Sequence, residues 1–106
     1  MKRGLSEICY GFFSTLANPT RLAILEALKE NGEMNVSGLA DELGQEQSMI
    51  SHNLKILERC NLIYSERRGK RKLAFLNRDT VEPLFEIVEN HAENYCDYPG
   101  ACKFAR

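Results

Sequence analysis

The first candidate for chemistry in this sequence is a dense run of positive charge. The segment SERRGKRK, residues 65–72, holds five of the chain's fourteen Lys and Arg residues, although the formal net charge of all 106 residues is only −1. A run of this kind attracts a polyanion such as nucleic acid, or it is an ordinary solvated loop. Its bases are Arg67, Arg68, Lys70, Arg71 and Lys72.

Charge is divided unevenly along the chain around this segment. Residues 55–78 hold eight bases and two acids, whereas residues 79–98 hold six acids and neither Lys nor Arg. Because the whole chain is nearly neutral, this division belongs to the arrangement of the charges and not to their total. We expect one part of the folded protein to attract a polyanion and another part to stay away from it.

A second set of chemically capable side chains lies on one helix, predicted from about Gln47 to Cys60. Its apolar edge is formed by Ile50, Leu54 and Leu57, at the i, i+4, i+7 spacing of one helix face. Short polar side chains can form hydrogen bonds to the edges of nucleobases in the major groove of DNA, and Lys or Arg side chains beside them can position the helix on the phosphates. The polar edge consists of Gln47, Ser48, Ser51, His52 and Lys55.

Plainer interpretations of this polar edge stay open. Gln47 and Ser48 could serve only the positive N-terminus of the helix, by capping it or by contacting a phosphate. His52 could be a solvent-facing helix residue without a partner. The order and spacing of the whole set, and not any one member, favour base reading.

Two helices are predicted before this one in the first third of the chain. Apolar side chains recur at helical spacing over residues 5–17, with Ser6 as the expected N-cap. Asn18 and Pro19 then begin a second helix, as its N-cap and first helical residue. Gly32 is expected to end that second helix.

A helix-turn-helix is predicted next, after a short extended piece over residues 33–36. Ser37 is expected to cap the third helix, and Gly44 supplies the tight turn that leads to the helix of residues 47–60. Two short helices joined by a turn that contains glycine, the second with a polar face, are typical of this motif. We place it at about residues 37–60.

The basic segment is predicted to form the tip of a β-hairpin over about residues 62–77. Two extended runs rich in Ile, Tyr, Leu and Phe lie on either side of the sequence Arg-Arg-Gly-Lys-Arg. A tight hairpin turn usually needs a residue with positive φ, which Gly69 supplies. The hairpin would then be a wing beside the helix-turn-helix.

The last predicted helix covers about residues 79–96 and is acidic. Asp79 is expected to begin it, with Glu82 as its capping-box partner and Pro83 still in the first turn. The sequence DYPGA is expected to end it. An apolar stripe along this helix indicates core or a subunit interface: Val81, Leu84, Phe85, Val88, Ala92 and Tyr95.

Length and composition restrict the class of protein. A chain of 106 residues with 43% hydrophobic residues is expected to form a single domain, residues 1–106. The N-terminus has no apolar run of signal-peptide length, and no segment approaches the roughly 20 apolar residues that span a bilayer. We therefore expect a cytoplasmic protein without membrane contact. Because neither a nucleophile–base constellation nor a phosphate loop is visible, we do not expect an enzyme.

Three stretches of the chain resemble the ArsR/SmtB-type winged-helix repressors. They are LANPTRLAILEAL, LADELGQEQSMISHNLKILERCNLI and RRGKRKLAFL, and the resemblance covers residues 8 to about 95. It implies a mostly α fold of about five helices with a two-stranded wing, dimeric through the first and last helices. It also implies a homodimer that binds a palindromic double-stranded DNA operator and releases it when an inducer binds. Gln47, Ser48, Ser51 and His52 match the family's base-reading positions, and residues 67–72 match its wing tip.

The chain departs from the family's pattern in three places. Glu46 stands where the family usually has a Ser or Thr cap, and it brings an acid near the phosphates. The family's Cys-x-Cys metal element is absent from the segment EMNVSGLA. The family's second metal site, in the last helix, is kept only as fragments around Asp79 and His91.

The cysteines leave three interpretations open. Without an export signal, the four cysteines are poor evidence for structural disulfides, and we take Cys60 as a core residue. The others could hold a soft or borderline divalent ion such as zinc, form a thiol switch, or have no sensory role. The acids beside them favour metal over thiol chemistry. The candidate ligands are Cys9, His91, Cys96 and Cys102.

The sequence thus predicts a sequence-specific DNA-binding transcriptional regulator, a dimeric repressor, and leaves open whether it responds to metal or to thiol state. One alternative is a winged-helix module that binds protein, for which exposed aromatic side chains would be expected between Gln47 and Lys55, where the sequence has none. A second is a regulator with no sensory site of its own, and a third is a small protein that handles thiols or metals.

Overall fold

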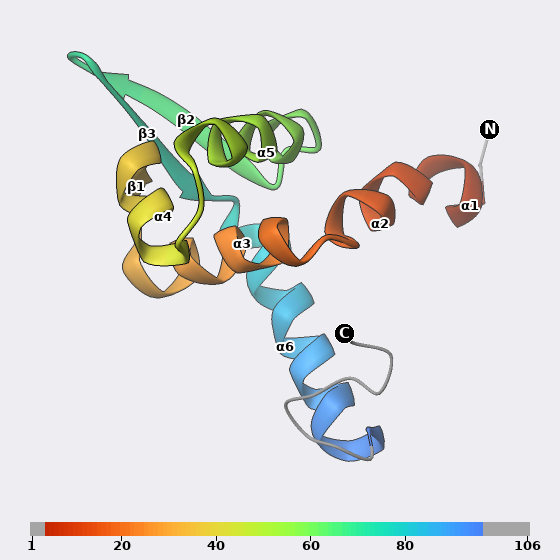
Figure 1. Cartoon of the computed structure of the whole chain (residues 1–106). Helices are drawn as coiled ribbons and strands as arrows, with labels where there is room; N and C mark the ends of the chain where they lie inside the picture. The colour runs from red at the N-terminus through yellow and green to blue at the C-terminus, as the bar shows by residue number, and fades with distance from the viewer. Residues whose placement is uncertain (1–3, 97–106) are drawn as a thin grey trace.

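The computed structural model describes residues 4–96, apart from the side chain of residue 8, and shows helices around a small antiparallel sheet (Figure 1). Within these residues there are six helices and three strands. This confirms the mostly helical winged fold with its hairpin. The elements are α1 (Leu5–Ile8), α2 (Tyr10–Leu16), α3 (Pro19–Asn31), β1 (Met34–Asn35), α4 (Val36–Leu43), α5 (Gln47–Arg59), β2 (Ile63–Arg68), β3 (Arg71–Leu76) and α6 (Arg78–Tyr95).

The N-terminal segment is two helices and not the single one expected over residues 5–17. The break is at Cys9, whose backbone angles of φ −107° and ψ 3° are not helical. Gly11 follows two residues later, and a helical glycine costs about 1 kcal/mol relative to alanine, so local preference does little to hold the helix together here. The prediction of Ser6 as the cap is wrong, because Gly4 occupies that position.

The start of α3 is built as its sequence predicts. Asn18 is the N-cap, and its Oδ1 accepts a hydrogen bond of 3.0 Å from the backbone N–H of Arg21. Pro19 is the first helical residue, and Gly32 ends the helix. These local signals are independent of the rest of the fold, which explains why they can be read from the sequence.

The helix-turn-helix consists of α4 and α5. Asn35 caps α4 in place of Ser37, because its extended backbone lets Oδ1 accept a hydrogen bond of 2.7 Å from the N–H of Gly38. Ser37 consequently lies inside the helix. Gly44 ends α4 in the left-handed region, with φ 63°, as expected for the turn.

The sheet has three strands in the order β1-β3-β2, one more than the expected two-stranded wing. The added strand is the short extended piece before α4, in which Met34 pairs with Ala74 and Asn35 with Leu73. The hairpin of β2 and β3 turns at Gly69, whose φ is 63°. Figure 1 shows its tip extending beyond the helices.

The beginning of α6 differs in detail from the sequence prediction. It begins at Arg78 and not at Asp79, and Asn77 occupies the cap position. The expected capping box is not formed, because Glu82 pairs with Arg78 four residues before it. Pro83 lies inside the helix and not in its first turn. The expected stop at DYPGA lies outside the described residues.

The core forms where α3, α4, α5 and the sheet meet. The apolar faces of α4 and α5 lie inward as their spacing predicts, and β3 contributes its alternate residues Ala74 and Leu76. Figure 1 shows α2 and α6 extending away from this body in different directions. No helix among residues 4–96 is both long enough and apolar enough to cross a membrane. The fully buried large side chains are Ile24, Leu25, Leu28, Leu39, Ile50, Leu57, Leu62, Ile63 and Val81.

Replacing Gly44 by alanine is expected to lower the free energy of unfolding by about 1 kcal/mol. The space around a Cβ at this position is open, so the cost comes from the left-handed backbone alone. Asparagine tolerates that backbone better, and Gly44→Asn should therefore be less harmful than Gly44→Ala. Urea denaturation of the three proteins measures the difference. Equal stability of the two variants would contradict the explanation.

Candidate nucleic-acid interface

The polar edge of α5 lies on the surface of the molecule. Gln47, Ser48, His52 and Lys55 are exposed, and Ser51 is half-buried. The opposite face is fixed in place because Ile50, Leu54 and Leu57 are buried in the core, as their spacing predicts. The helix therefore has one orientation in which its apolar side chains avoid water, and in that orientation the polar edge faces out.

Glu58, near the end of α5, links this helix to both strands of the hairpin. Its Oε2 accepts a hydrogen bond of 2.6 Å from the hydroxyl of Ser65 on β2. Its Oε1 lies 3.6 Å from the Nζ of Lys72 on β3. The helix and the hairpin are thus held beside each other, as a reading helix and its wing would need to be.

The basic residues of the hairpin lie on two faces of the sheet. Residues paired across antiparallel strands point to the same face. Arg67 pairs with Lys72, in line with the inward-facing pairs nearer the core, whereas Arg68 pairs with Arg71 on the outer face. Lys70 lies in the turn. All five basic side chains are exposed, so the hairpin presents positive charge on both sides of its tip.

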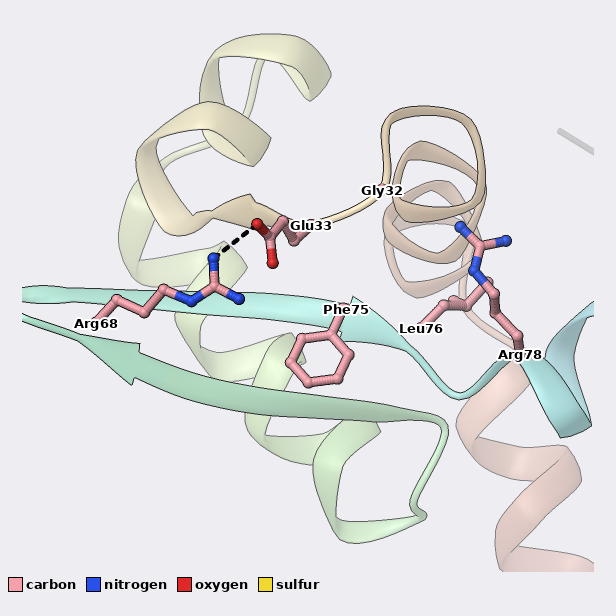
Figure 2. A pocket seen from close by; sticks show the side chains of 6 residues that line it. All are labelled: Gly32, Glu33, Arg68, Phe75, Leu76 and Arg78. Carbon is pink, nitrogen blue, oxygen red and sulfur yellow. Dashed lines mark hydrogen bonds and ion pairs between the residues drawn. The ribbon is translucent and has the colours of Figure 1, made fainter.

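Arg68 is held by two carboxylates on the outer face. Its Nε donates to Glu66 at 2.5 Å and its Nη1 donates to Glu33 at 2.8 Å. These hydrogen bonds, to Glu66 first and Glu33 second, raise the pKa of the Arg68 guanidinium above its ordinary value. Figure 2 shows Arg68 and Glu33 meeting beside an open hollow. Its volume is about 430 Å³, and its other lining residues are Gly32, Phe75, Leu76 and Arg78.

Asn53 is a residue of α5 that the sequence analysis missed. It is 6% exposed and accepts a hydrogen bond of 2.9 Å from Nη1 of Arg21 on α3. A signal for it was present, because Asn53 lies three residues after Ile50 and four before Leu57, on the apolar face of the helix. A polar residue at such a position must find a partner inside the protein.

The proposed metal ligands are not assembled within the described part of one chain. Cys9 lies between α1 and α2, His91 is exposed on α6, and Cys96 follows α6. Residues 4–96 contain no cluster of three or more His, Cys, Asp or Glu placed to hold a metal ion. Cys102 lies outside the described residues. Metal binding by these residues therefore stays a prediction.

Cys60, predicted as a core residue, is half-buried and packs against the core. Its Sγ lies 3.3 Å from Oγ1 of Thr15 on α2. The end of α5 is therefore in contact with α2.

Comparison with known proteins identifies the family of this chain. Residues 18–65 match the family described as bacterial regulatory protein, arsR family. An uncharacterised HTH-type transcriptional regulator of Methanocaldococcus jannaschii is 35% identical over 73% of this chain and 86% of its own. The chain belongs to the arsR family of transcriptional regulators. It is therefore a DNA-binding regulator and not an enzyme, as its sequence predicts.

Two further proteins that are similar to this arsR-family chain are a homodimeric domain and a cadmium resistance regulator. The solution structure of a homodimeric winged helix-turn-helix DNA-binding domain from Mycobacterium bovis has 26% identity and a TM-score of 0.75, covering 90% of each chain. The cadmium resistance transcriptional regulatory protein CadC of Listeria innocua is 29% identical over 78% of this chain and 70% of its own.

Glu33→Gln is expected to strengthen binding to duplex DNA about threefold. The change removes a carboxylate near the hairpin and leaves Arg68 freer to meet a phosphate. Fluorescence anisotropy with a labelled duplex measures the affinity, and Glu30→Gln, at an exposed acid of α3, is the matched control. A weaker Glu33→Gln complex would instead mean that the pair with Arg68 holds the wing in its binding position.

Proposed function

We propose that this arsR-family protein is a homodimeric repressor that binds a palindromic DNA operator through α5 and the hairpin. The observation that supports this most directly is the exposed polar edge of α5 beside a basic hairpin, with Glu58 linking the two. A helix fits the major groove, and a hairpin at its side can follow the adjacent backbone.

The side chains of α5 have distinct proposed roles. Gln47 can offer a paired donor and acceptor to adenine, and Ser48, Ser51 and His52 can form hydrogen bonds to several nucleobases.

Positive side chains have a different proposed role, because their contacts with phosphates hold the helix in register without reading sequence. Gly69 lacks a Cβ, which lets the hairpin tip approach the backbone closely. The proposed phosphate contacts are Lys55, Arg67, Arg68, Lys70, Arg71 and Lys72.

The proposed dimer interface is the apolar surface that α2 and α6 leave uncovered. Tyr10 and Phe13 on α2 are exposed, and so are Ile87, Val88 and Tyr95 on α6. A hollow between α3 and α6 adds Leu22 and Phe85 to this surface. Exposed apolar patches of this kind mark interaction sites, and the similar homodimeric domain from Mycobacterium bovis supports a second copy as the partner.

A role in binding protein through α5 has less support. The stretch from Gln47 to Lys55 contains no aromatic side chain, whereas protein interfaces are enriched in them. Its polar side chains and the five bases of the hairpin suit a polyanion better.

Replacing the five hairpin bases, Arg67, Arg68, Lys70, Arg71 and Lys72, by alanine is expected to weaken DNA binding and make it less dependent on salt. Each phosphate that the variant no longer neutralises should reduce the slope of log affinity against log salt by roughly 0.9. Anisotropy titrations over a salt series measure this slope. Arg78→Ala, a base outside the hairpin, is the matched control and should keep the original slope. An unchanged slope in the five-alanine variant would remove the wing from the proposal.

Combining Phe13→Glu with Ile87→Glu is expected to give a monomer. Both side chains are more than half exposed in one chain, at 56% and 68%, and two copies would bury them together. Affinity for a palindromic duplex should fall about 100-fold or more, because the second half-site no longer binds as part of the same molecule.

Analytical ultracentrifugation measures the assembly of this double variant. Tyr64→Glu serves as the control, since Tyr64 is also an exposed aromatic residue, at 46%, but lies on the sheet. A dimeric double variant would contradict the proposed interface.

A further inference from the structure

A chain of hydrogen bonds joins the three helices α2, α3 and α5. Arg21, in the first turn of α3, donates from Nε to the backbone oxygen of Thr15 on α2 at 2.7 Å. It donates from Nη1 to Oδ1 of Asn53 on α5 at 2.9 Å. Asn53 in turn donates from Nδ2 to the backbone oxygen of Met49 at 3.0 Å, which fixes the orientation of its amide.

Two members of this chain of hydrogen bonds are buried residues. Asn53 is 6% exposed, and Thr15 is 8% exposed. Arg21 is half-buried, and its own backbone N–H donates to the cap residue Asn18. A guanidinium has several donors in a rigid plane, so one side chain can hold two acceptors on different helices at a set distance. Polar links of this kind are geometrically strict because an unpaired buried group is costly.

The two helices that Arg21 joins have different proposed tasks. The exposed aromatic residues of α2, Tyr10 and Phe13, belong to the proposed dimer interface. The polar edge of α5 reads the operator. A second contact reinforces the connection at the end of α5, where Cys60 Sγ lies 3.3 Å from Thr15 Oγ1. These side chains therefore connect α5 to the helix that carries part of the proposed dimer interface.

A dimer reads both halves of a palindrome only if its two reading helices match the spacing of the half-sites. Apolar packing in the core fixes which face of α5 is inward, but the attraction between apolar side chains has no preferred direction. A hydrogen bond from a planar guanidinium has one, and it weakens when donor and acceptor move apart or out of line. The link through Arg21 can thus control spacing, whereas general core packing controls stability.

We propose that Arg21 is a positioning residue for DNA reading, which holds Asn53 to the end of α2 and thereby sets the half-site spacing that the dimer accepts. This inference rests on the function proposed above. Arg21 and Asn53 need not touch DNA for it to hold. Loss of their hydrogen bond widens the range of spacings that bind, while the phosphate contacts of the hairpin stay the same.

The test measures spacing preference, which general destabilisation would not change. The unaltered protein first selects a duplex from a random-sequence pool, and versions of that duplex gain or lose one base pair between the half-sites. The ratio of affinities for the selected and altered spacings should fall about tenfold in Asn53→Leu and in Arg21→Lys. Affinity for a scrambled duplex, and its salt dependence, should not change.

Two further variants separate positioning from other effects. Asn53→Asp gives up the donation to Met49 but keeps an oxygen acceptor for Arg21, now with a charge that strengthens this bond, and should retain the original spacing preference. Asn31→Leu is the matched control, because Asn31 also donates to the carbonyl four residues before it and also reaches another helix, at Glu42. It should leave the ratio unchanged. Circular dichroism confirms folding, and if Asn53→Leu does not fold, Arg21→Lys decides the test.

The outcomes are distinguishable from failure of the proposed function. If the unaltered protein selects no duplex, the proposed operator binding fails and this inference fails with it. If it selects one, and Arg21→Lys and Asn53→Leu keep the original ratio, only the inference is overturned. A fall of the same size in Asn31→Leu would also overturn it, because the effect would then not be specific to the α2–α5 link.

Discussion

Burial of one edge of α5 is the constraint on which the rest of the molecule depends. Ile50, Leu54 and Leu57 pack against the core, and burying side chains of this size contributes about 1.5–3 kcal/mol each. A rotation of the helix would expose them and bury serine and glutamine instead, at a further cost. The hydrophobic effect has no direction of its own, but here it determines which polar side chains face outward and so which of them can meet a ligand.

The charged side chains are positioned on the arrangement of elements that this burial fixes. Five bases are gathered at the hairpin tip, and the acidic residues of α6 lie on an element that extends away from it (Figure 1). The near-neutral total therefore hides two regions of opposite sign. Glu33, Glu58 and Glu66 are different, because each lies within reach of a hairpin base. These ion pairs weaken the positive electrostatic field of the hairpin and orient the basic side chains that produce it.

The outer helices have little core of their own. On α6 only Val81 is buried among the described residues, while apolar side chains further along the helix stay exposed. A domain of this size buries a limited share of its surface, and a second copy is a common way to cover the remainder. In such a dimer the contacts would have to fix the position of each reading helix as well as bury apolar surface. The polar link through Arg21 is the described contact best suited to that task, because one side chain of α3 reaches both α2 and α5.

The sequence alone determined the features that depend on near neighbours. Asn18 and Pro19 begin α3, Gly44 and Gly69 allow turns with positive φ, and the spacing of Ile50, Leu54 and Leu57 orients α5. Each follows from propensities or periodicity within a few residues. Only the tertiary structure decided the pairing of Met34 with Ala74, the ion pair of Arg68 with Glu33, and the contact of Asn53 with Arg21. Their partners are 32 or more residues apart in sequence, and no local pattern specifies which distant side chain will come within hydrogen-bonding distance.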